Sequence, residues 1–163
     1  MPEYRGSLTH RGMPAGVGGA LPDHDAWMET CIARNARWFD PARTADLWAR
    51  MRDLPREAVD VMTHGDLVPG HVLIDGGRLV GLLDGGGFGP ADPALDLVAA
   101  WHLLDGPRRD RLRAALRPSD LDWERGRAWA FAQAMGLVHY YVTTNPEMHR
   151  LGHRTMTELL GSH

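Results

Sequence analysis

The feature that most constrains the fold of this chain is a predicted β-hairpin near the middle of a sequence whose other patterns are helical. Two short apolar runs, Val72–Asp75 and Leu79–Asp84, are separated by Gly76-Gly77. A glycine pair supplies the positive φ angles that a two-residue hairpin turn needs. Because a hairpin brings its two outer ends together, His71 and Asp84 are expected to lie close to each other.

Helical patterns occupy most of the remaining sequence. Apolar residues recur at spacings of three and four, and Asp-Pro or Asn-Pro pairs mark several helix starts. The expected helices cover approximately residues 23–38, 40–54, 92–105, 108–117, 121–142 and 145–160. The sequence therefore predicts an α+β fold, mainly α, with one small central β-hairpin on a bed of helices.

Length and composition favour one domain, because 163 residues are enough to form a core without a disulfide. Residues 1–22, rich in glycine and proline, are expected to form a tail or a lid, and residues 23–163 a single lobe.

No apolar run reaches the roughly 20 residues that span a bilayer, and the N-terminus lacks a signal-peptide core. The single cysteine, Cys31, cannot form an internal disulfide. We therefore expect a cytoplasmic protein with no membrane partner.

The charged residues exclude several classes of function. The formal net charge is -3, and arginines alternate with acids instead of forming a basic stripe, so nucleic acid is not an expected partner. All 18 basic residues are arginine. Because this sequence contains no lysine, it excludes a mechanism that needs a lysine amine from these residues, either as a Schiff base or as a phosphate anchor.

Three ionisable residues are expected to meet at the hairpin: Asp66 in the loop before it, His71 at its start and Asp84 at its end. In phosphoryl transfer, one carboxylate orients or deprotonates the acceptor hydroxyl, and oxygen ligands hold magnesium on the nucleotide. The kinase signature supplies these groups as a His-x-Asp loop, an asparagine five residues after that aspartate, and an aspartate on the next hairpin. The same spacing joins Asp66, His71 and Asp84 here.

Three motifs together resemble the aminoglycoside and macrolide phosphotransferases, antibiotic kinases with a protein-kinase-like fold. The motifs are His64-Gly65-Asp66-Leu67, Leu83-Asp84 and the run DPALDL at residues 92–97. The resemblance covers about residue 21 to the end and implies the C-terminal helical lobe of that fold. It further implies that Asp66 is the catalytic base, Asp84 a metal ligand, and Asp96 a structural group behind the loop.

The sequence departs from this family in two ways. His71 stands where the family has asparagine, and magnesium prefers hard oxygen ligands to an imidazole. The family's N-terminal β-sheet lobe, which carries the nucleotide-anchoring lysine, does not fit into residues 1–22. We therefore expect the nucleotide lobe to be absent, no cofactor to be needed, and an uncovered lobe face that favours a homodimer or another partner chain.

The leading hypothesis is a repurposed lobe that binds a small natural-product-like molecule and acts on it without ATP. Asp66, His71 and Asp84 are the expected catalytic residues, by proton transfer or by orienting the ligand. The first alternative is a residual or split antibiotic phosphotransferase that uses Mg-ATP with a partner lobe. The second is a non-catalytic drug-binding or scaffold protein.

The role of His71 stays open among three possibilities. It is a general acid or base beside two carboxylates, a drifted residue at a former metal position, or a metal ligand together with Asp84. The ligand pocket is expected to be lined by side chains near the loop and on the long helix at 121–142, because aromatic walls with few polar tips are typical of ligand pockets. The expected substrate-binding residues are His64, His139, Tyr140 and Trp27.

Overall fold

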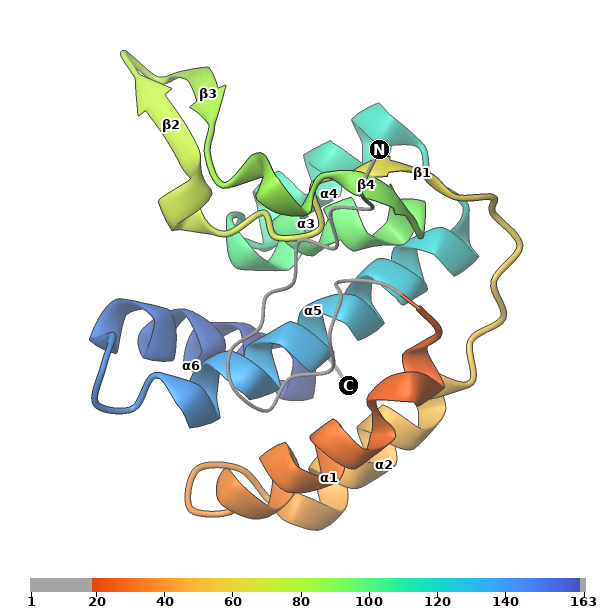
Figure 1. Ribbon diagram of the computed structural model, residues 1–163, viewed down its shortest axis with the longest axis vertical. Helices are drawn as coiled ribbons and strands as arrows, with labels where there is room; N and C mark the ends of the chain where they lie inside the picture. Colours follow the sequence, from red (N-terminus) through yellow and green to blue (C-terminus); the bar gives the residue numbers. More distant parts are fainter. Residues whose placement is uncertain (1–18, 162–163) are drawn as a thin grey trace.

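The computed structural model describes residues 19–161, which form a mainly helical body with two small antiparallel sheets at one edge of it (Figure 1). The α-helices are α1 (Asp25–Arg34), α2 (Pro41–Arg52), α3 (Ala99–His102), α4 (Gly106–Leu116), α5 (Asp120–Tyr140) and α6 (Pro146–Gly161). The strands are β1 (Val61–Thr63), β2 (Val72–Asp75), β3 (Arg78–Leu82) and β4 (Gly89–Ala91). Short 3-10 helices are η1 (Leu21–His24), η2 (Pro69–His71), η3 (Gly85–Gly87) and η4 (Pro93–Val98). The α+β class with mainly helical content is confirmed.

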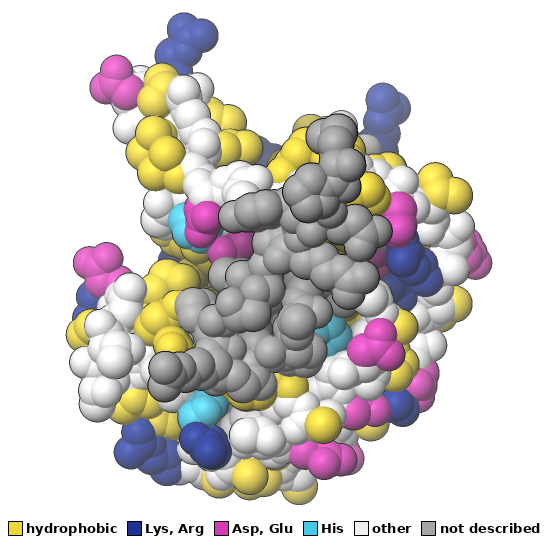
Figure 2. Space-filling model, in the orientation of Figure 1, with side chains coloured by type: hydrophobic (Ala, Val, Ile, Leu, Met, Phe, Trp, Pro, Cys, Tyr) yellow, Lys and Arg dark blue, Asp and Glu magenta, His cyan; other side chains and the backbone are white. Residues whose placement is uncertain are grey.

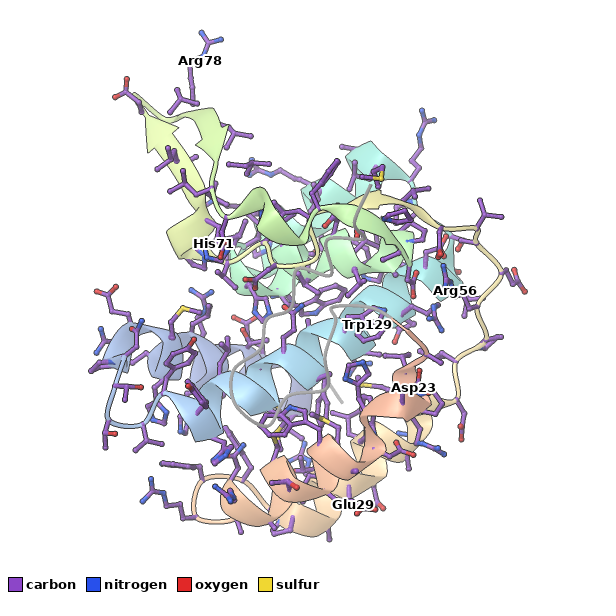
Figure 3. All side chains as sticks on the ribbon, viewed as in Figure 1. Asp23, Glu29, Arg56, His71, Arg78 and Trp129 are labelled. Carbon is purple, nitrogen blue, oxygen red and sulfur yellow. The ribbon has the colours of Figure 1, made fainter. Side chains whose placement is uncertain are left out.

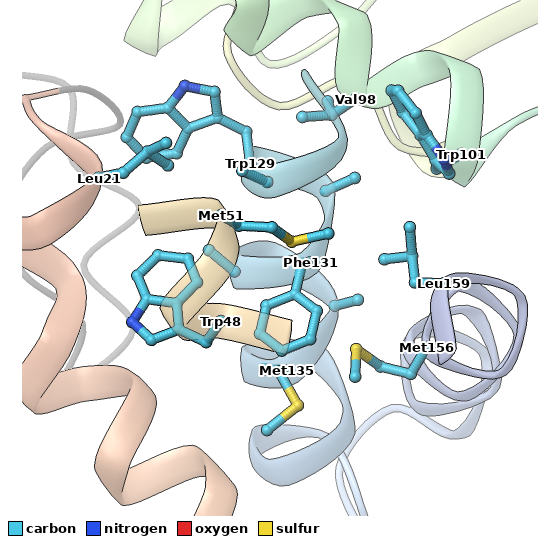
Figure 4. Close-up of a cluster of buried hydrophobic side chains, with 14 of the residues drawn as sticks. Leu21, Trp48, Met51, Val98, Trp101, Trp129, Phe131, Met135, Met156 and Leu159 are labelled. Atoms are coloured by element: carbon cyan, nitrogen blue, oxygen red, sulfur yellow. The ribbon is translucent and has the colours of Figure 1, made fainter. Parts of the chain in front are cut away.

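Helix α5 is the central element of the fold. Figure 1 shows α1 and α2 on one side of it and α6 on the other. Its apolar stripe is buried as the sequence predicts, and Trp129, Phe131 and Met135 are each 2% exposed or less. Trp48 of α2 stacks on Phe131 with ring centroids 5.9 Å apart (Figure 4). The core therefore forms around α5.

Side-chain caps start four of the described α-helices, and at α6 Asn145 Oδ1 accepts a hydrogen bond from the Met148 amide. Asp40 accepts a hydrogen bond from the Ala42 amide, Asp105 from the Arg108 amide, and Ser119 from the Asp122 amide. Each cap satisfies an amide that has no partner inside its own helix. These contacts explain why the helix starts were readable from the sequence.

The start at Asp92 differs from the expectation. Asp92 caps the next segment through the Ala94 amide, but that segment is the 3-10 helix η4, and α-helical geometry begins only at α3. The predicted α-helix over 92–105 is therefore wrong for its first half. The reason is tertiary: η4 lies against α5 so closely that a Cβ on Gly126 would come within 2.5 Å of Leu97 Cβ. Packing of this kind overrides local helix propensity.

The predicted β-hairpin is present between β2 and β3. Gly76 and Gly77 form its turn with φ angles of 53° and 75°, which are left-handed values that favour glycine. The hairpin projects away from the helices (Figure 1), and Arg78 lies at its tip (Figure 3). Both strands carry exposed apolar side chains, which gather on the projecting arm in Figure 2. They are Leu73, Ile74, Leu79, Val80 and Leu82, between 42% and 61% exposed.

A second antiparallel pair, β1 with β4, has no counterpart in the sequence-based prediction. Its strands are three residues long, and Val61 pairs with Ala91 while Thr63 pairs with Gly89. Strands this short, one of which contains glycine and proline, carry too little alternation to be recognised in a sequence. This pair holds the start of the loop that leads to Asp66.

Residues 1–18 of the expected tail or lid lie outside the described part of the chain. Leu21, near the end of that segment, is 1% exposed and belongs to the hydrophobic core. Within residues 19–161, none of the helices has the length and apolar character needed to cross a membrane.

A buried ion pair joins η4 to α5. Arg125 donates to Asp92 Oδ2 through Nε at 3.0 Å and through Nη2 at 2.5 Å, and the two side chains are 3% and 1% exposed. Trp129 Nε1 donates to the same oxygen at 3.0 Å, and Arg125 Nη1 reaches the Leu54 carbonyl at 2.6 Å. Burial raises the pKa of Asp92, but the hydrogen bonds from Trp129, Arg125 and the Ala94 amide, together with the charge of Arg125, outweigh this effect. The net pKa of Asp92 therefore lies below its ordinary value.

The close approach of α6 to α5 depends on Gly152. A Cβ at this position would lie 2.8 Å from the Val138 backbone nitrogen and 2.9 Å from the Ala134 carbonyl oxygen. Because a backbone cannot yield as a side chain can, Gly152→Ala is expected to lower the free energy of unfolding by about 1–3 kcal/mol in urea titrations. Gly161→Ala is the matched control, since nothing lies within 4 Å of a Cβ there. Equal stability of the two variants would contradict this account of the α5–α6 contact.

Candidate active site

The loop of residues 64–71 connects β1 to the hairpin and is fixed from behind by Asp96 of η4. The Asp96 carboxylate accepts the amide of His64 at 3.0 Å and that of Gly65 at 2.8 Å. Gly65 has a φ of 74°, a conformation that favours glycine at this bend. Asp96 therefore lies behind the loop, where the family resemblance places it, and holds the backbone that carries Asp66.

His64 points into the protein. Its side chain belongs to the buried set, and its Nε2 lies 2.8 Å from the Leu83 carbonyl oxygen. A carbonyl only accepts, so His64 Nε2 carries the proton and donates it. This contact ties the loop to the strand end before Asp84. His64 therefore connects the loop before the hairpin to Leu83, the residue that follows β3.

The three expected catalytic residues do lie together, and we call Asp66, His71 and Asp84 the Asp–His–Asp site. His71 Nδ1 lies 3.3 Å from Asp66 Oδ2, and His71 Nε2 lies 3.6 Å from Asp84 Oδ2. The side chains of Asp66, His71 and Asp84 are 15%, 22% and 62% exposed, respectively. Figure 3 shows His71 at the base of the hairpin. The imidazole therefore stands between a sheltered carboxylate and an exposed one.

The backbone determines the proton position on His71. Its Nδ1 lies 2.8 Å from the Asp66 carbonyl oxygen, which can only accept, so Nδ1 carries a proton. Nε2 is then the nitrogen that gains or loses a proton, and it faces Asp84. A histidine held in this way by a backbone carbonyl presents a directed lone pair when neutral and a donor toward Asp84 when charged.

Asp84 has an unusual backbone conformation for a residue with a side chain. Its φ and ψ are 57° and 42°, in the left-handed region. Aspartate tolerates this region better than most residues, although at some cost in energy, and such residues concentrate at functional sites. This conformation supports a functional interpretation of Asp84 that does not depend on its sequence motif.

The donor set of the Asp–His–Asp site does not match magnesium. The three side chains offer one ligand atom each within 4.8 Å of one another, but the central one is an imidazole. Magnesium needs near-ideal octahedral oxygen coordination, whereas imidazole suits zinc, nickel, copper or iron. Asp84 and His71 could hold a metal of the second kind, with Asp66 alongside.

A pocket opens beside Asp66 and His71, between the loop, α5 and α6. It has a volume of about 160 Å³. Its lining combines the Asp–His–Asp site with apolar and aromatic side chains: Asp66, Val68, His71, Asp84, Gln133, Gly136, Leu137, Tyr140, Tyr141 and Met148. Burial, Tyr140 and the charge of Asp66 together raise the pKa of Tyr141, so its phenol stays neutral near pH 7. The Asp–His–Asp site thus borders a space that can hold a small ligand.

The four expected substrate-binding residues are placed differently. Tyr140 lines the pocket, whereas His64 lies behind the loop. Trp27 is 8% exposed and packs against His139 with ring centroids 5.9 Å apart. Burial, with a further contribution from Arg34, lowers the pKa of His139. Among the described residues, Trp27 and His139 do not belong to the lining of this pocket.

Sequence reasoning missed a buried chain of hydrogen bonds that ends at the loop. Gln133 of α5 donates to the Gly65 carbonyl at 2.8 Å and accepts from His102 at 3.2 Å. The second ring nitrogen of His102 lies 3.2 Å from Thr155 Oγ1 of α6. The one available signal was a glutamine inside an otherwise apolar stretch of α5. This chain links α3, α5 and α6 to the peptide next to Asp66.

Comparison with known proteins places this site in a family. The family model described as "Phosphotransferase enzyme family" matches residues 10–129, a range that includes Asp66, His71 and Asp84. The chain belongs to this phosphotransferase family. The resemblance stated from the sequence is therefore confirmed at the level of the family, while the assignment to one lobe of the kinase-like fold remains a prediction.

Curated relatives in this phosphotransferase family are similar over a limited region. An aminoglycoside 3'-phosphotransferase of Escherichia coli is 37% identical over 71 residues, which is 40% of this chain and 26% of that protein. The aminoglycoside 3'-phosphotransferase of Salmonella typhimurium gives the same values. The chain thus aligns with about a quarter of the length of these relatives. No solved structure matched the chain significantly.

His102 gives the fold a pH dependence. Burial is the main reason that its pKa falls to about 4, whereas an unfolded histidine titrates near 6.5. The contribution of His102 to the free energy of unfolding is therefore complete above pH 6.5. It decreases as the pH falls from 6.5 toward about 4, by up to ~3 kcal/mol. Urea unfolding from pH 7 to 4.5 should show a shallower pH dependence for His102→Gln than for the wild type. Parallel curves would contradict the buried neutral histidine.

Replacing His71 tests the mismatch with magnesium. His71→Asn introduces an amide oxygen next to Asp84, so calorimetry with Mg²⁺ is expected to detect binding that the wild type lacks. The double variant His71→Asn, Asp84→Asn is the control, and it should lose the gain because it removes the carboxylate ligand. Magnesium binding by the wild type as strong as that of His71→Asn would show that the imidazole is no obstacle.

Proposed function

We propose that this phosphotransferase-family protein binds a small natural-product-like molecule in the pocket beside Asp66 and acts on it by proton transfer, without ATP. The observation that carries the proposal is the position of His71, whose ring stands between Asp66 and Asp84. A nucleotide-dependent site would need an oxygen ligand for magnesium at this position. The proposal therefore includes no cofactor.

Each residue of the Asp–His–Asp site has a role in this proposal. Asp66 is the general base, because its carboxylate borders the pocket and is only 15% exposed. His71 lies beside this carboxylate, with Nδ1 3.3 Å from Oδ2, while its Nδ1 proton is donated to the Asp66 backbone carbonyl. Asp84 orients the other side of the imidazole. A ligand hydroxyl next to Asp66 would give its proton to the carboxylate.

The buried hydrogen-bond chain supports a positioned base. Gln133 holds the Gly65 carbonyl at 2.8 Å and Asp96 holds the Gly65 amide at 2.8 Å, so both polar groups of Gly65 are bound. The residue before Asp66 therefore has little freedom to move. A general base is effective only when its distance to the transferred proton is fixed.

ATP-dependent phosphotransfer to a small molecule is the second candidate. The arrangement that favours it is the retained loop, in which Asp66, Asp84 and Asp96 stand where the family motif has its aspartates. The curated relatives are named aminoglycoside 3'-phosphotransferases. Under this alternative, a partner lobe would supply the nucleotide site and Mg-ATP would be the cofactor.

A non-catalytic role in drug binding or as a scaffold is the third candidate. In that case Asp66 and Asp84 would persist without acting on the ligand. The pocket alone is compatible with this role, since binding needs shape and a few polar groups but no base.

The proposal also includes a second chain and a cytoplasmic location. The exposed apolar residues of the hairpin would be covered in a homodimer or by another partner. The single cysteine, Cys31, is buried, and burial raises its pKa to about 12, so it neither needs an oxidising compartment nor reacts readily.

Asp66→Asn tests the proposed base. The wild type and the variant are incubated with an apyrase-treated extract of bacterial small molecules, and mass spectrometry follows which compounds disappear. The wild type is expected to convert a compound without added nucleotide, and Asp66→Asn to convert it about 10²–10⁴-fold more slowly.

The same experiment separates the alternatives. Conversion only after addition of Mg-ATP, together with a gain of mass equal to a phosphoryl group, would establish the second candidate. Equal compound binding by the wild type and Asp66→Asn, with no conversion under either condition, would establish the third. Asp110→Asn, a change of the same kind on α4 away from the pocket, controls for the change in net charge.

A further inference from the structure

We propose that the part of the ligand held in the pocket is a phenol: a single uncharged aromatic ring whose hydroxyl points at Asp66. This inference rests on the proposed function for one element only, the role of Asp66 as acceptor of the hydroxyl proton. It is argued from the charge, the polar groups and the size of the pocket.

The charges of the pocket argue against a polycation. Asp66 and Asp84 are the acids of the lining, and both face His71, at 3.3 Å and 3.6 Å. An ammonium-rich ligand would need several carboxylates, one for each desolvated ammonium group. Two acids that already share one imidazole do not meet this requirement. The part of the ligand in the pocket is therefore not a polycation.

The polar groups of the lining fit a ligand portion with few hydroxyl groups. Apart from the Asp–His–Asp site and the tyrosines, the polar side chain of the lining is Gln133. Its amide oxygen bonds His102 and its nitrogen bonds the Gly65 carbonyl. A sugar ring would bring several hydroxyl groups into this space, and a buried hydroxyl without a partner is costly. A phenol brings one hydroxyl, which Asp66 can accept.

The size and walls of the pocket fit an aromatic ring. The volume of about 160 Å³ is close to the roughly 150 Å³ of a cavity that accepts benzene. Tyr140 and Met148 line it from α5 and from the start of α6, and Tyr140 meets Tyr141 edge to face at 4.9 Å. Rings pack well against tyrosine edges and against methionine sulfur. The remainder of a larger ligand would extend out of the pocket.

The test compares four probes on the full chain by ¹H–¹⁵N NMR titration. They are 4-methylphenol, toluene, methyl β-D-glucopyranoside and kanamycin, a polycationic aminoglycoside. We expect 4-methylphenol to shift the amides of Gly136 and Tyr140. Toluene, which lacks the hydroxyl, should bind roughly tenfold more weakly, because a hydrogen bond to a charged group is lost. The other two probes should leave these amides unchanged at equal concentration.

Variants connect binding to the pocket. Tyr140→Ala and Met148→Ala should each weaken the binding of 4-methylphenol, whereas Tyr140→Phe, which keeps the ring, should retain it. Leu116→Ala on α4, at a side chain that is 57% exposed and outside the pocket, is the control and should bind like the wild type. Unchanged binding in both alanine variants would overturn the assignment of the ring to this pocket.

Failure of this inference can be told apart from failure of the proposed function. Tighter binding of kanamycin or of the glucoside than of 4-methylphenol, lost in Asp66→Asn, would overturn the phenol and leave Asp66 as the acceptor. Equal binding of toluene and 4-methylphenol would also overturn it. Equal binding of 4-methylphenol by the wild type and Asp66→Asn would instead contradict the acceptor role of Asp66.

Discussion

The buried ion pair between Asp92 and Arg125 is the interaction on which the geometry of the site depends. Both side chains are at most 3% exposed, and loss of either partner would leave an unpaired charge inside the protein. The pair fixes the beginning of η4 on α5. Because η4 carries Asp96, and Asp96 holds the His64 and Gly65 amides, the position of the loop that bears Asp66 follows from this pair.

The parts of the fold that could be predicted from the sequence are those with local causes. The hairpin could be predicted from Gly76-Gly77, because glycine adopts positive φ angles without the help of distant residues. The start of α2 could be predicted from Asp40, because its carboxylate binds the amide of Ala42, only two residues away. The β1–β4 pair and the 3-10 geometry of η4 have causes distant in the sequence. Thr63 pairs with Gly89, and η4 is shaped by its contact with Gly126. No short window of sequence contains either contact.

The residues of the site also fall into those that could be predicted from the sequence and those that could not. Turn geometry brings together Asp66, His71 and Asp84, so their meeting could be predicted from the spacing alone. The opposite wall of the pocket comes from α5 and α6, where Gln133 and Met148 look like ordinary helix residues. Trp27 and His139 illustrate the converse, since aromatic residues at helical spacing contact each other outside the pocket lining. The polar motifs are therefore easier to recognise in the sequence than the residues that line the rest of the pocket.

The hydrogen bond from His71 Nδ1 to the Asp66 carbonyl gives the imidazole a direction. With Nδ1 donating to that carbonyl, the other ring nitrogen, Nε2, faces Asp84, whose side chain is 62% exposed. Asp66 lies at the Nδ1 side of the ring, and the pocket borders all three side chains. Of the two carboxylates, solvent therefore reaches Asp84, at the base of the hairpin, more readily than Asp66.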